Sequence, residues 1–154
     1  MQKKQRFIDK FKSRSSFTNE FLVICPQCSN KAKVFSLEPI SNAWYNKEWR
    51  VACTKCNYFS QTTSGDSITL YIDRDWYFQL PLYYTIETKN GSLYAYNDEH
   101  LNYIEKYIFS ELRERKRDDK WGWSNQSQIS RLPKWVKLAK NRTKLLSLIK
   151  KLKK

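Results

Sequence analysis

Apolar and polar residues alternate differently in the two halves of the chain, and the change comes near residue 97. Before it, four short runs rich in β-branched and aromatic residues lie at 21–24, near 33–37, at the end of 44–52 and at 57–63. Such runs predict β-strands. Each run borders one of two cysteine pairs, so the sequence predicts a strand–turn–strand arrangement that is used twice.

Three further apolar runs follow: ITLYI at 68–72, LPLYYTIET at 80–88 and LYAY at 93–96. Pro81 should restrict where the second run pairs, because proline lacks an amide donor. KNGS at 89–92 predicts a type I′ turn, since Asn-Gly tolerates its positive φ angles. The sequence therefore predicts an antiparallel extension that ends in a hairpin.

After residue 96, apolar residues recur every three or four positions, the period of an amphipathic helix. Asn97 supplies a capping side chain, and Asp98 and Glu99 follow at the positive end of the helix dipole. The predicted helix spans 97–117. Its buried stripe consists of Leu101, Ile104, Ile108 and Leu112, with Tyr107 beside them. Its last turn would carry the basic residues Arg113, Arg115, Lys116 and Arg117.

The rest of the chain predicts a polar loop followed by basic helices. Residues 118–130 are polar and include Gly122, which favours a loop or linker. Residues 131–154 predict one or two helices, with Pro133 in a first turn and Thr143 capping the last helix. The expected buried faces consist of the apolar residues of each helix, namely Trp135, Leu138 and Ala139, then Leu145, Leu148, Ile149 and Leu152.

The chain has 154 residues and a net charge of +14. Residues 131–154 hold ten basic and no acidic residues, whereas residues 61–99 have a net charge of −4. This asymmetry favours attraction of a polyanion to the basic ends of the chain. No apolar run approaches the roughly 20 residues that a membrane span needs. The N-terminus has no apolar signal-peptide core, so we expect a cytoplasmic protein.

Four cysteines form two close pairs, Cys25-Pro-Gln-Cys28 and Cys53-Thr-Lys-Cys56, with 24 residues between the pairs. In a reducing compartment such pairs favour metal binding over disulfides. Thiolates two residues apart can reach one ion at about 2.3 Å. Four thiolates fill a tetrahedral coordination sphere and leave no position for water, which favours one structural zinc ion. An iron–sulfur cluster and a redox CxxC pair are the weaker alternatives.

Each cysteine pair needs a tight turn, and Asn30 and Asn57 lie where a residue that tolerates left-handed backbone is expected. The predicted fold class is α+β: a four-cysteine zinc ribbon with an antiparallel β-hairpin extension, followed by an amphipathic helix and C-terminal basic helices. The expected segments are a basic N-terminal arm, the ribbon, the hairpin with its helix, a linker and a basic helical tail, at 1–20, 21–63, 64–117, 118–130 and 131–154. The arm carries sparse apolar anchors that favour a short docking helix, namely Phe7, Ile8, Phe11 and Phe17.

Basic residues near the ribbon alternate with aromatic ones, among them Trp44, Tyr45, Trp49, Tyr58 and Phe59. Cations can neutralise phosphates while aromatic rings stack on bases. The alternative, favoured for most of these rings, is that they form the ribbon's own core. The C-terminal segment favours nucleic acid over an anionic membrane surface or an acidic protein. The candidate contacts are Lys31, Lys33, Arg50, Lys55, Lys134, Lys137, Lys140, Arg142 and Lys144.

Catalytic patterns are absent from the sequence, which contains no phosphate loop and no Ser/His/Asp set. His100 is the single histidine and falls in the first turn of a predicted helix, where a structural role is expected. Asp73 and Asp75 would share one face of a strand without a matching acid, base or nucleophile. The sequence therefore predicts a protein that is not an enzyme.

Three stretches carry a family resemblance: the CPQC and CTKC pairs, LYAYNDEHLNYIEKYIFSELRER at 93–115, and SRLPKWVKLAKNR at 130–142 with its amphipathic tail. Together they resemble small bacterial proteins known as zinc-ribbon-containing, of the transcription-factor-IIB type. The resemblance covers most of residues 21–154 and implies the fold and the zinc ion, but little about function.

The function that we expect is non-enzymatic binding of DNA or RNA through the basic terminal segments. Two alternatives are a protein-interaction adaptor that uses the aromatic β-surface and a ribosome-associated factor, since ribosomal RNA is the most abundant polyanion of the cytosol. Sequence alone leaves these targets open.

Overall fold

The structure is a computed structural model that describes residues 4–38, 48–63, 69–115, 117, 119–120, 122 and 125–154. The fold is α+β, with antiparallel β-hairpins and a C-terminal helix. The chain forms two compact units, Thr18–Asp98 and Met1–Phe17 with Glu99–Lys154, which we call the β unit and the helical unit. The boundary after Asp98 falls inside the predicted segment 64–117. The helical unit combines residues from both ends of the chain.

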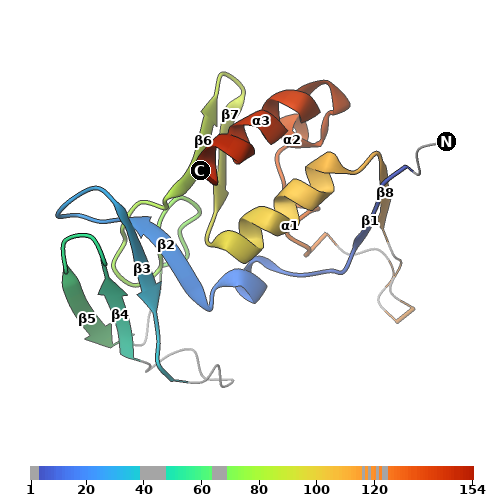
Figure 1. Ribbon diagram of the computed structural model, residues 1–154. Coiled ribbons are helices and arrows are strands. Elements are labelled where there is room, and N and C mark those ends of the chain that lie inside the picture. Colours follow the sequence, from blue (N-terminus) through green and yellow to red (C-terminus); the bar gives the residue numbers. More distant parts are fainter. Residues whose placement is uncertain are drawn as a thin grey trace. The chain divides into compact units, whose positions relative to one another are not determined.

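The β unit contains a four-stranded antiparallel sheet whose strands lie in chain order (Figure 1). The strands are β2 (Glu20–Ile24), β3 (Lys31–Phe35), β4 (Glu48–Ala52) and β5 (Phe59–Thr63). Alternate residues point to opposite faces of a strand, so one face collects the buried side chains Phe21, Val23, Ala32, Val34, Trp49 and Val51. The four predicted strands beside the cysteine pairs are confirmed.

Aromatic side chains from residues 69–80 pack on the sheet residues Phe21 and Trp49. Tyr77 stacks on Trp49 with ring centroids 3.8 Å apart, and the Trp76 ring lies 5.7 Å from that of Phe21. Among the described aromatics near the ribbon, the prediction that most of them form its core is confirmed for Trp49 alone: Tyr58 is half-buried and Phe59 is 54% exposed. The strand predicted at 68–72 is wrong over its described residues 69–72, which form no strand. Leu70 and Ile72 are exposed there, so the apolar side chains of this run do not pack against the core as a strand's would.

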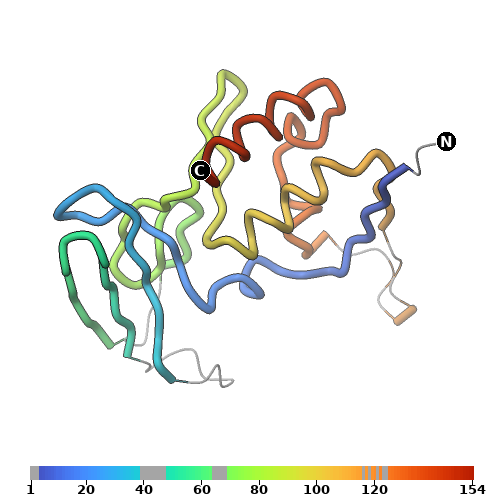
Figure 2. The backbone as a smooth tube through the Cα atoms, in the orientation of Figure 1, coloured from blue at the N-terminus to red at the C-terminus, as the bar shows by residue number. Residues whose placement is uncertain are grey.

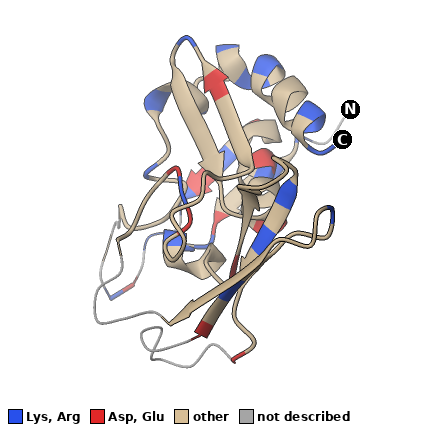
Figure 3. Cartoon of the chain, turned by 90° about the vertical axis from the view of Figure 1, so that its left-hand side faces the viewer, with Lys and Arg blue, Asp and Glu red and all other residues tan. Residues whose placement is uncertain are grey.

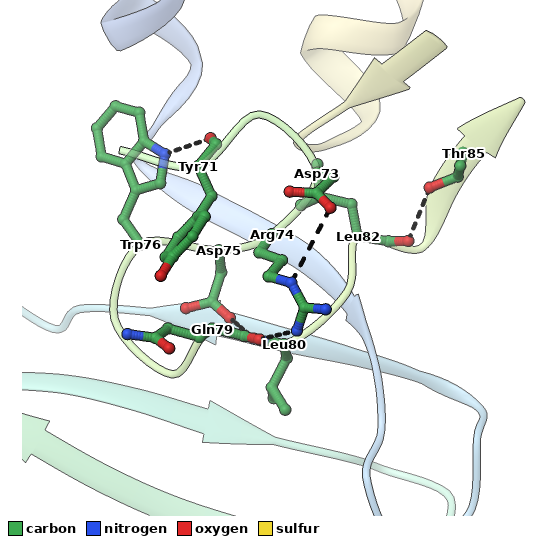
Figure 4. A network of polar contacts seen from close by, with 9 residues as sticks. All are labelled: Tyr71, Asp73, Arg74, Asp75, Trp76, Gln79, Leu80, Leu82 and Thr85. Carbon is green, nitrogen blue, oxygen red and sulfur yellow. Dashed lines mark hydrogen bonds and ion pairs between the residues drawn. The ribbon is translucent and has the colours of Figure 1, made fainter. Parts of the chain in front are cut away.

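Asp75 holds this loop together (Figure 4). Its buried carboxylate accepts backbone N–H groups from Tyr77, Phe78 and Leu80 at 2.6–2.8 Å. Three amides that would otherwise lack a partner in the loop are satisfied by one side chain. Burial raises the pKa of Asp75, and the amide bonds oppose that shift. The predicted strand that paired Asp73 with Asp75 on one face is therefore absent, and Asp75 has a structural role.

Strands β6 (Tyr84–Thr88) and β7 (Gly91–Ala95) form the predicted hairpin. Its loop consists of residues 89–90, because Thr88 pairs with Gly91. Gly91 has φ 134°, and Asn90 is not among the described residues with positive φ. A type I′ turn at Asn90–Gly91 was therefore wrong by one position: Gly91 lies at the start of the returning strand.

The helical unit begins with a strand where a docking helix was expected. β1 (Arg6–Asp9) pairs in parallel with β8 (Leu112–Arg115), and Figure 2 shows these two segments, blue and orange, running side by side. A 3₁₀ turn follows at Arg14–Phe17. The helix expected from the spacing of the apolar anchors is therefore wrong. These residues form a strand because they pair with a segment more than 100 residues away in the sequence.

Helix α1 spans Asp98–Phe109, directly after Asn97 as predicted, and ends eight residues before the predicted end at 117. The stripe of Leu101, Ile104 and Ile108 is buried, whereas Leu112 lies on β8 and is 41% exposed. At the end of the helix the Ser110 hydroxyl and the Ser110 amide both donate to the Lys106 carbonyl, at 2.7 and 3.2 Å.

Arg113 was predicted in the last turn of this helix but lies beyond its end and caps it. Its guanidinium donates to the carbonyls of Tyr107, Ile108 and Ser110 at 3.2 Å. The same group donates to the Lys137 carbonyl at 2.6 Å and lies 4.3 Å from the centre of the Tyr107 ring. One side chain therefore satisfies carbonyls at the ends of two helices.

The C-terminal segment contains α2 (Lys134–Lys137), a 3₁₀ turn at Ala139–Asn141 and α3 (Arg142–Leu152). In α3, Leu145 and Ile149 are buried as predicted, and Leu148 and Leu152 are half-buried. The predicted face of α2 is wrong: Val136 is its buried residue, while Leu138 and Ala139 are exposed. Asn141, not Thr143, occupies the cap position of α3.

Residues 118–130 were predicted as a loop, and the described ones form no helix or strand. They are nevertheless partly buried, since Ser127 and Ile129 are at most 5% exposed. Among the described helices, none is long and apolar enough to span a bilayer.

Candidate metal centre

The two cysteine pairs occupy equivalent turns at the end of the sheet. One turn connects β2 to β3, and the other connects β4 to β5. In the first, the Cys25 amide donates to the Asn30 carbonyl at 2.8 Å, and the Ser29 amide donates to the Cys25 carbonyl at 2.9 Å. In the second, the matching bonds join Cys53 with Tyr58 at 2.9 Å and Asn57 with Cys53 at 3.0 Å. The two turns therefore have the same pattern of backbone hydrogen bonds.

The residue after each second cysteine has a left-handed backbone. Ser29 and Asn57 both have φ 61°, a conformation that most residues adopt at a cost. The prediction is confirmed for Asn57 and wrong for Asn30, because Ser29 occupies the equivalent position in the first turn. Asn30 contributes through its side chain instead: its amide Nδ2 lies 3.4 Å from Cys28 Sγ and 3.3 Å from the Cys28 carbonyl.

The four sulfur atoms face one another within 4.8 Å. Cys25 Sγ and Cys56 Sγ are 3.6 Å apart, as are Cys28 Sγ and Cys53 Sγ. A disulfide requires about 2.05 Å, so all four are free thiols. Four sulfurs about 2.3 Å from a central ion in a tetrahedron would be about 3.8 Å apart. The group can therefore hold one metal ion.

Hydrogen bonds and burial act differently on the four thiols. Cys25 and Cys53 are buried, and Cys28 and Cys56 are half-buried. The side-chain and backbone N–H groups of Asn30 lower the pKa of Cys28 to about 6. Loss of hydration raises the pKa of Cys56, and the neighbouring sulfurs raise it further. Four adjacent thiolates repel one another, so a cation is what would allow all four to ionise together.

Four of the predicted nucleic-acid contacts lie in the β unit, near the cysteines. Lys31 and Lys33 project from the outer face of β3, Arg50 lies on β4, and Lys55 is exposed in the second turn. Lys33 forms an ion pair with Glu20 at 2.7 Å. The neighbouring aromatics Trp44 and Tyr45 lie outside the described residues.

Two more contacts restrict these cations. Arg50 pairs with Glu48 at 2.7 Å. The ammonium group of Lys31 lies over the rings of Tyr83 and Tyr84, 4.9 and 5.3 Å from their centres. The outer face of the sheet is thus less available to a polyanion than the sequence suggested.

The other five predicted contacts lie in the helical unit. Lys134, Lys140 and Lys144 are exposed, and Figure 3 shows blue residues recurring along the C-terminal helix. Lys137 differs, because it is half-buried and its ammonium donates to the Ser130 carbonyl at 2.7 Å. Arg142 is also half-buried.

Sequence analysis missed Asn30 as a donor to sulfur and Arg113 as a double helix cap. An asparagine two residues after a CxxC pair is a local signal that could have identified the first. The second depends on two helix ends meeting, which no local pattern encodes. Comparison with known proteins adds no relative: no family model, no curated protein and no solved structure matches this chain.

Proposed function

We propose that the chain is a non-enzymatic zinc-ribbon protein that binds DNA or RNA through its helical unit. The observation that carries the proposal is the charge of residues 131–154, ten basic and no acidic residues, of which Lys134, Lys140 and Lys144 are exposed. A surface helix needs no such excess for solubility, and phosphates are the natural counter-charge.

Zinc is the ion that we propose for the four cysteines, in a structural role. Four thiolates suit zinc or a single iron ion equally in geometry. The sulfurs leave no open ligand position, which favours a fold-stabilising ion over a catalytic one. Metal analysis of the purified protein separates the two: one equivalent of zinc supports the proposal, and a coloured protein with one equivalent of iron contradicts it.

A salt titration tests nucleic-acid binding. Filter binding to a DNA duplex and to a single-stranded RNA, at several salt concentrations, gives the slope of log affinity against log salt. For duplex DNA each phosphate contact contributes about 0.9 to that slope. Replacing Lys134, Lys140 and Lys144 by Gln should therefore lower the slope by about 2.7.

The matched control removes three lysines from the β unit, Lys31, Lys33 and Lys55, again by change to Gln. We expect a smaller loss of slope, because Lys33 is already paired with Glu20. The absence of measurable affinity for either nucleic acid at low salt would contradict the proposal. Cosedimentation with ribosomal particles would assign the RNA as ribosomal.

The adaptor alternative is supported by two apolar side chains on the outer face of the sheet. Phe59 is 54% exposed and Ile24 is 36% exposed, and ion pairs flank them. Such a mixture suits a protein partner better than a phosphate backbone. Copurification of one stoichiometric protein that survives nuclease and high salt, and is lost on changing Phe59 to Ser, would favour this alternative.

A further inference from the structure

The helical unit contains a pocket of about 290 Å³ that the proposed function does not use. Its walls come from β1, β8, the end of α1 and the segment that leads into α2. The volume is at the lower end of the range for ligand pockets, enough for one small ligand. Phe7 and Tyr107 supply aromatic surface, with ring centroids 5.4 Å apart.

Three cations line this pocket: Arg113, Arg115 and Lys137. Arg113 is held by four backbone carbonyls, and Arg115 donates to the Asn125 side chain at 3.1 Å. Lys137 is fixed by the Ser130 carbonyl at 2.7 Å. In the part of the chain that the structure describes, no carboxylate forms an ion pair with Arg113 or Lys137.

Two acidic residues also line the pocket, and both are engaged elsewhere. The buried Asp9 carboxylate accepts from the Ser127 hydroxyl at 2.6 Å and the Phe11 amide at 2.9 Å. Glu114 pairs with Arg6 at 3.1 Å. The cationic groups therefore face a half-buried space whose acids are already satisfied by other donors.

This arrangement holds like charges together at an electrostatic cost. Burial lowers the pKa of Lys137, and the charge of Arg115 lowers it further. An anion placed between the two would offset the repulsion and raise the pKa of Lys137 back toward its ordinary value. The pocket is thus arranged to gain stability from an anionic ligand.

We propose that this pocket binds a phosphate monoester through Arg115 and Lys137. A guanidinium offers two parallel donors to neighbouring oxygens, and an ammonium adds a point charge, a combination that suits a dianionic tetrahedral group. Arg113 adds a fixed positive charge to the pocket wall, and Phe7 and Tyr107 bound the space for the rest of the ligand. The inference deepens the proposed function and rests on it only for the source of the phosphate, a free nucleotide or the end of a nucleic-acid strand.

Calorimetric titration of the full chain with adenosine 5′-monophosphate, adenosine and inorganic phosphate at low salt tests the site. We expect the two phosphate compounds to bind and adenosine not to bind. Lys137→Gln and Arg115→Gln should each weaken binding at least tenfold. The matched control Lys140→Gln removes an equal charge from a residue outside the pocket and should change affinity less than twofold.

Circular dichroism verifies that each variant folds. Two pocket variants are used so that the test can still be made if one of them fails to fold. Equal binding by the wild type and both pocket variants would overturn the proposal, and so would a failure of both phosphate compounds to bind. Tighter binding of an oligonucleotide with a 5′-phosphate than of its 5′-hydroxyl counterpart assigns the ligand to a strand end. Equal binding of the two assigns it to a free nucleotide.

The same experiment separates this inference from the proposed function. The variant lacking Lys134, Lys140 and Lys144 should lose strand binding and retain adenosine 5′-monophosphate binding. If nucleic-acid strands do not bind but adenosine 5′-monophosphate does, the proposed function is wrong and the pocket proposal is supported. If strands bind and the mononucleotide does not, the pocket proposal fails alone.

Discussion

The two compact units of the chain carry very different electrical charge. The helical unit holds 22 basic and 7 acidic residues, a net charge of +15, whereas the β unit holds 7 basic and 8 acidic residues, a net charge of −1. The charge map along the sequence showed basic ends and an acidic middle. The structure groups both ends into one unit, so the whole excess belongs to the unit that lacks the cysteines.

The units also differ in what holds them together. In the β unit the Asp75 carboxylate satisfies backbone amides of one loop, and four cysteines at the end of the sheet could hold one metal ion. The helical unit has buried apolar side chains on α1 and α3, and Arg113 connects the ends of α1 and α2. The cysteine cluster and the basic C-terminal segment thus belong to different units, and we expect a change in one to leave the other undisturbed.

Loss of the cysteine cluster should give the largest effect. Structural zinc contributes about 10–16 kcal/mol of apparent binding free energy in small zinc modules. Cys53→Ser, or removal of metal by a chelator, should abolish amide protection in β2–β5 and leave α1 and α3 protected. Hydrogen exchange followed by mass spectrometry measures both units at once.

Thr54→Ser is the control for this change, because Thr54 is exposed in the same turn and provides no sulfur. Its exchange pattern should match the wild type. Unfolding of α1 and α3 together with the sheet would show that the units are not separable, and unchanged protection in β2–β5 would exclude a structural metal.

Removal of Arg113 should be the next largest effect and should fall on the helical unit. Arg113→Ala leaves carbonyls at the ends of α1 and α2 without their donor and removes the contact with the Tyr107 ring. We expect a loss of about 3–4 kcal/mol in the free energy of unfolding. Urea denaturation measures this loss. Arg113→Lys keeps the charge but not the several N–H donors of the guanidinium, so it should recover less than half of the lost free energy of unfolding.

Asp75 offers the corresponding test in the β unit. Asp75→Asn keeps the shape of the side chain but turns one acceptor oxygen into a donor that faces a backbone amide. We expect a loss of about 2 kcal/mol, because a buried amide then lacks its acceptor. Asp73→Asn is the matched control, since Asp73 is exposed and contacts Arg74 only at 4.0 Å. Equal losses for the two variants would contradict the assigned role of the loop.

The strands beside the cysteines and the start of α1 were predictable because their signals are local. Short runs rich in β-branched and aromatic residues beside the cysteine pairs identify β2 to β5, and the CxxC spacing alone identified all four residues of the sulfur cluster. The hairpin at Gly91 was also found, although its turn was placed one residue late. In each case the deciding signals are confined to short stretches of the chain.

The misplaced elements depend on distant partners. Residues 112–115 continue a helical pattern, yet they form β8 because Arg6–Asp9 supplies backbone partners. Likewise, the exposure of Leu138 and the capping by Arg113 follow from how two helix ends meet. The pocket around Lys137 combines residues from positions 7 to 137, so no local motif could have indicated it.

The last expected effect depends on pH and concerns the helical unit. His100 is buried and stacks on Phe17 with ring centroids 4.6 Å apart. Burial, and then the charge of Arg14, lower the pKa of His100 to about 3. The unfolded chain binds a proton below about pH 6.5 while the folded chain does not. Stability from this residue is therefore complete above about pH 6.5 and is lost as the pH falls toward 3.

The slope of that loss is at most about 1.4 kcal/mol per pH unit for one proton. His100→Phe keeps a ring against Phe17 and cannot be protonated, so it should flatten the decline between about pH 6.5 and 4.5, above the range where most carboxylates titrate. Urea denaturation at half-unit steps of pH measures the difference between the two proteins. An identical decline in both would place the acid sensitivity elsewhere and show that His100 is protonated without cost in the folded helical unit.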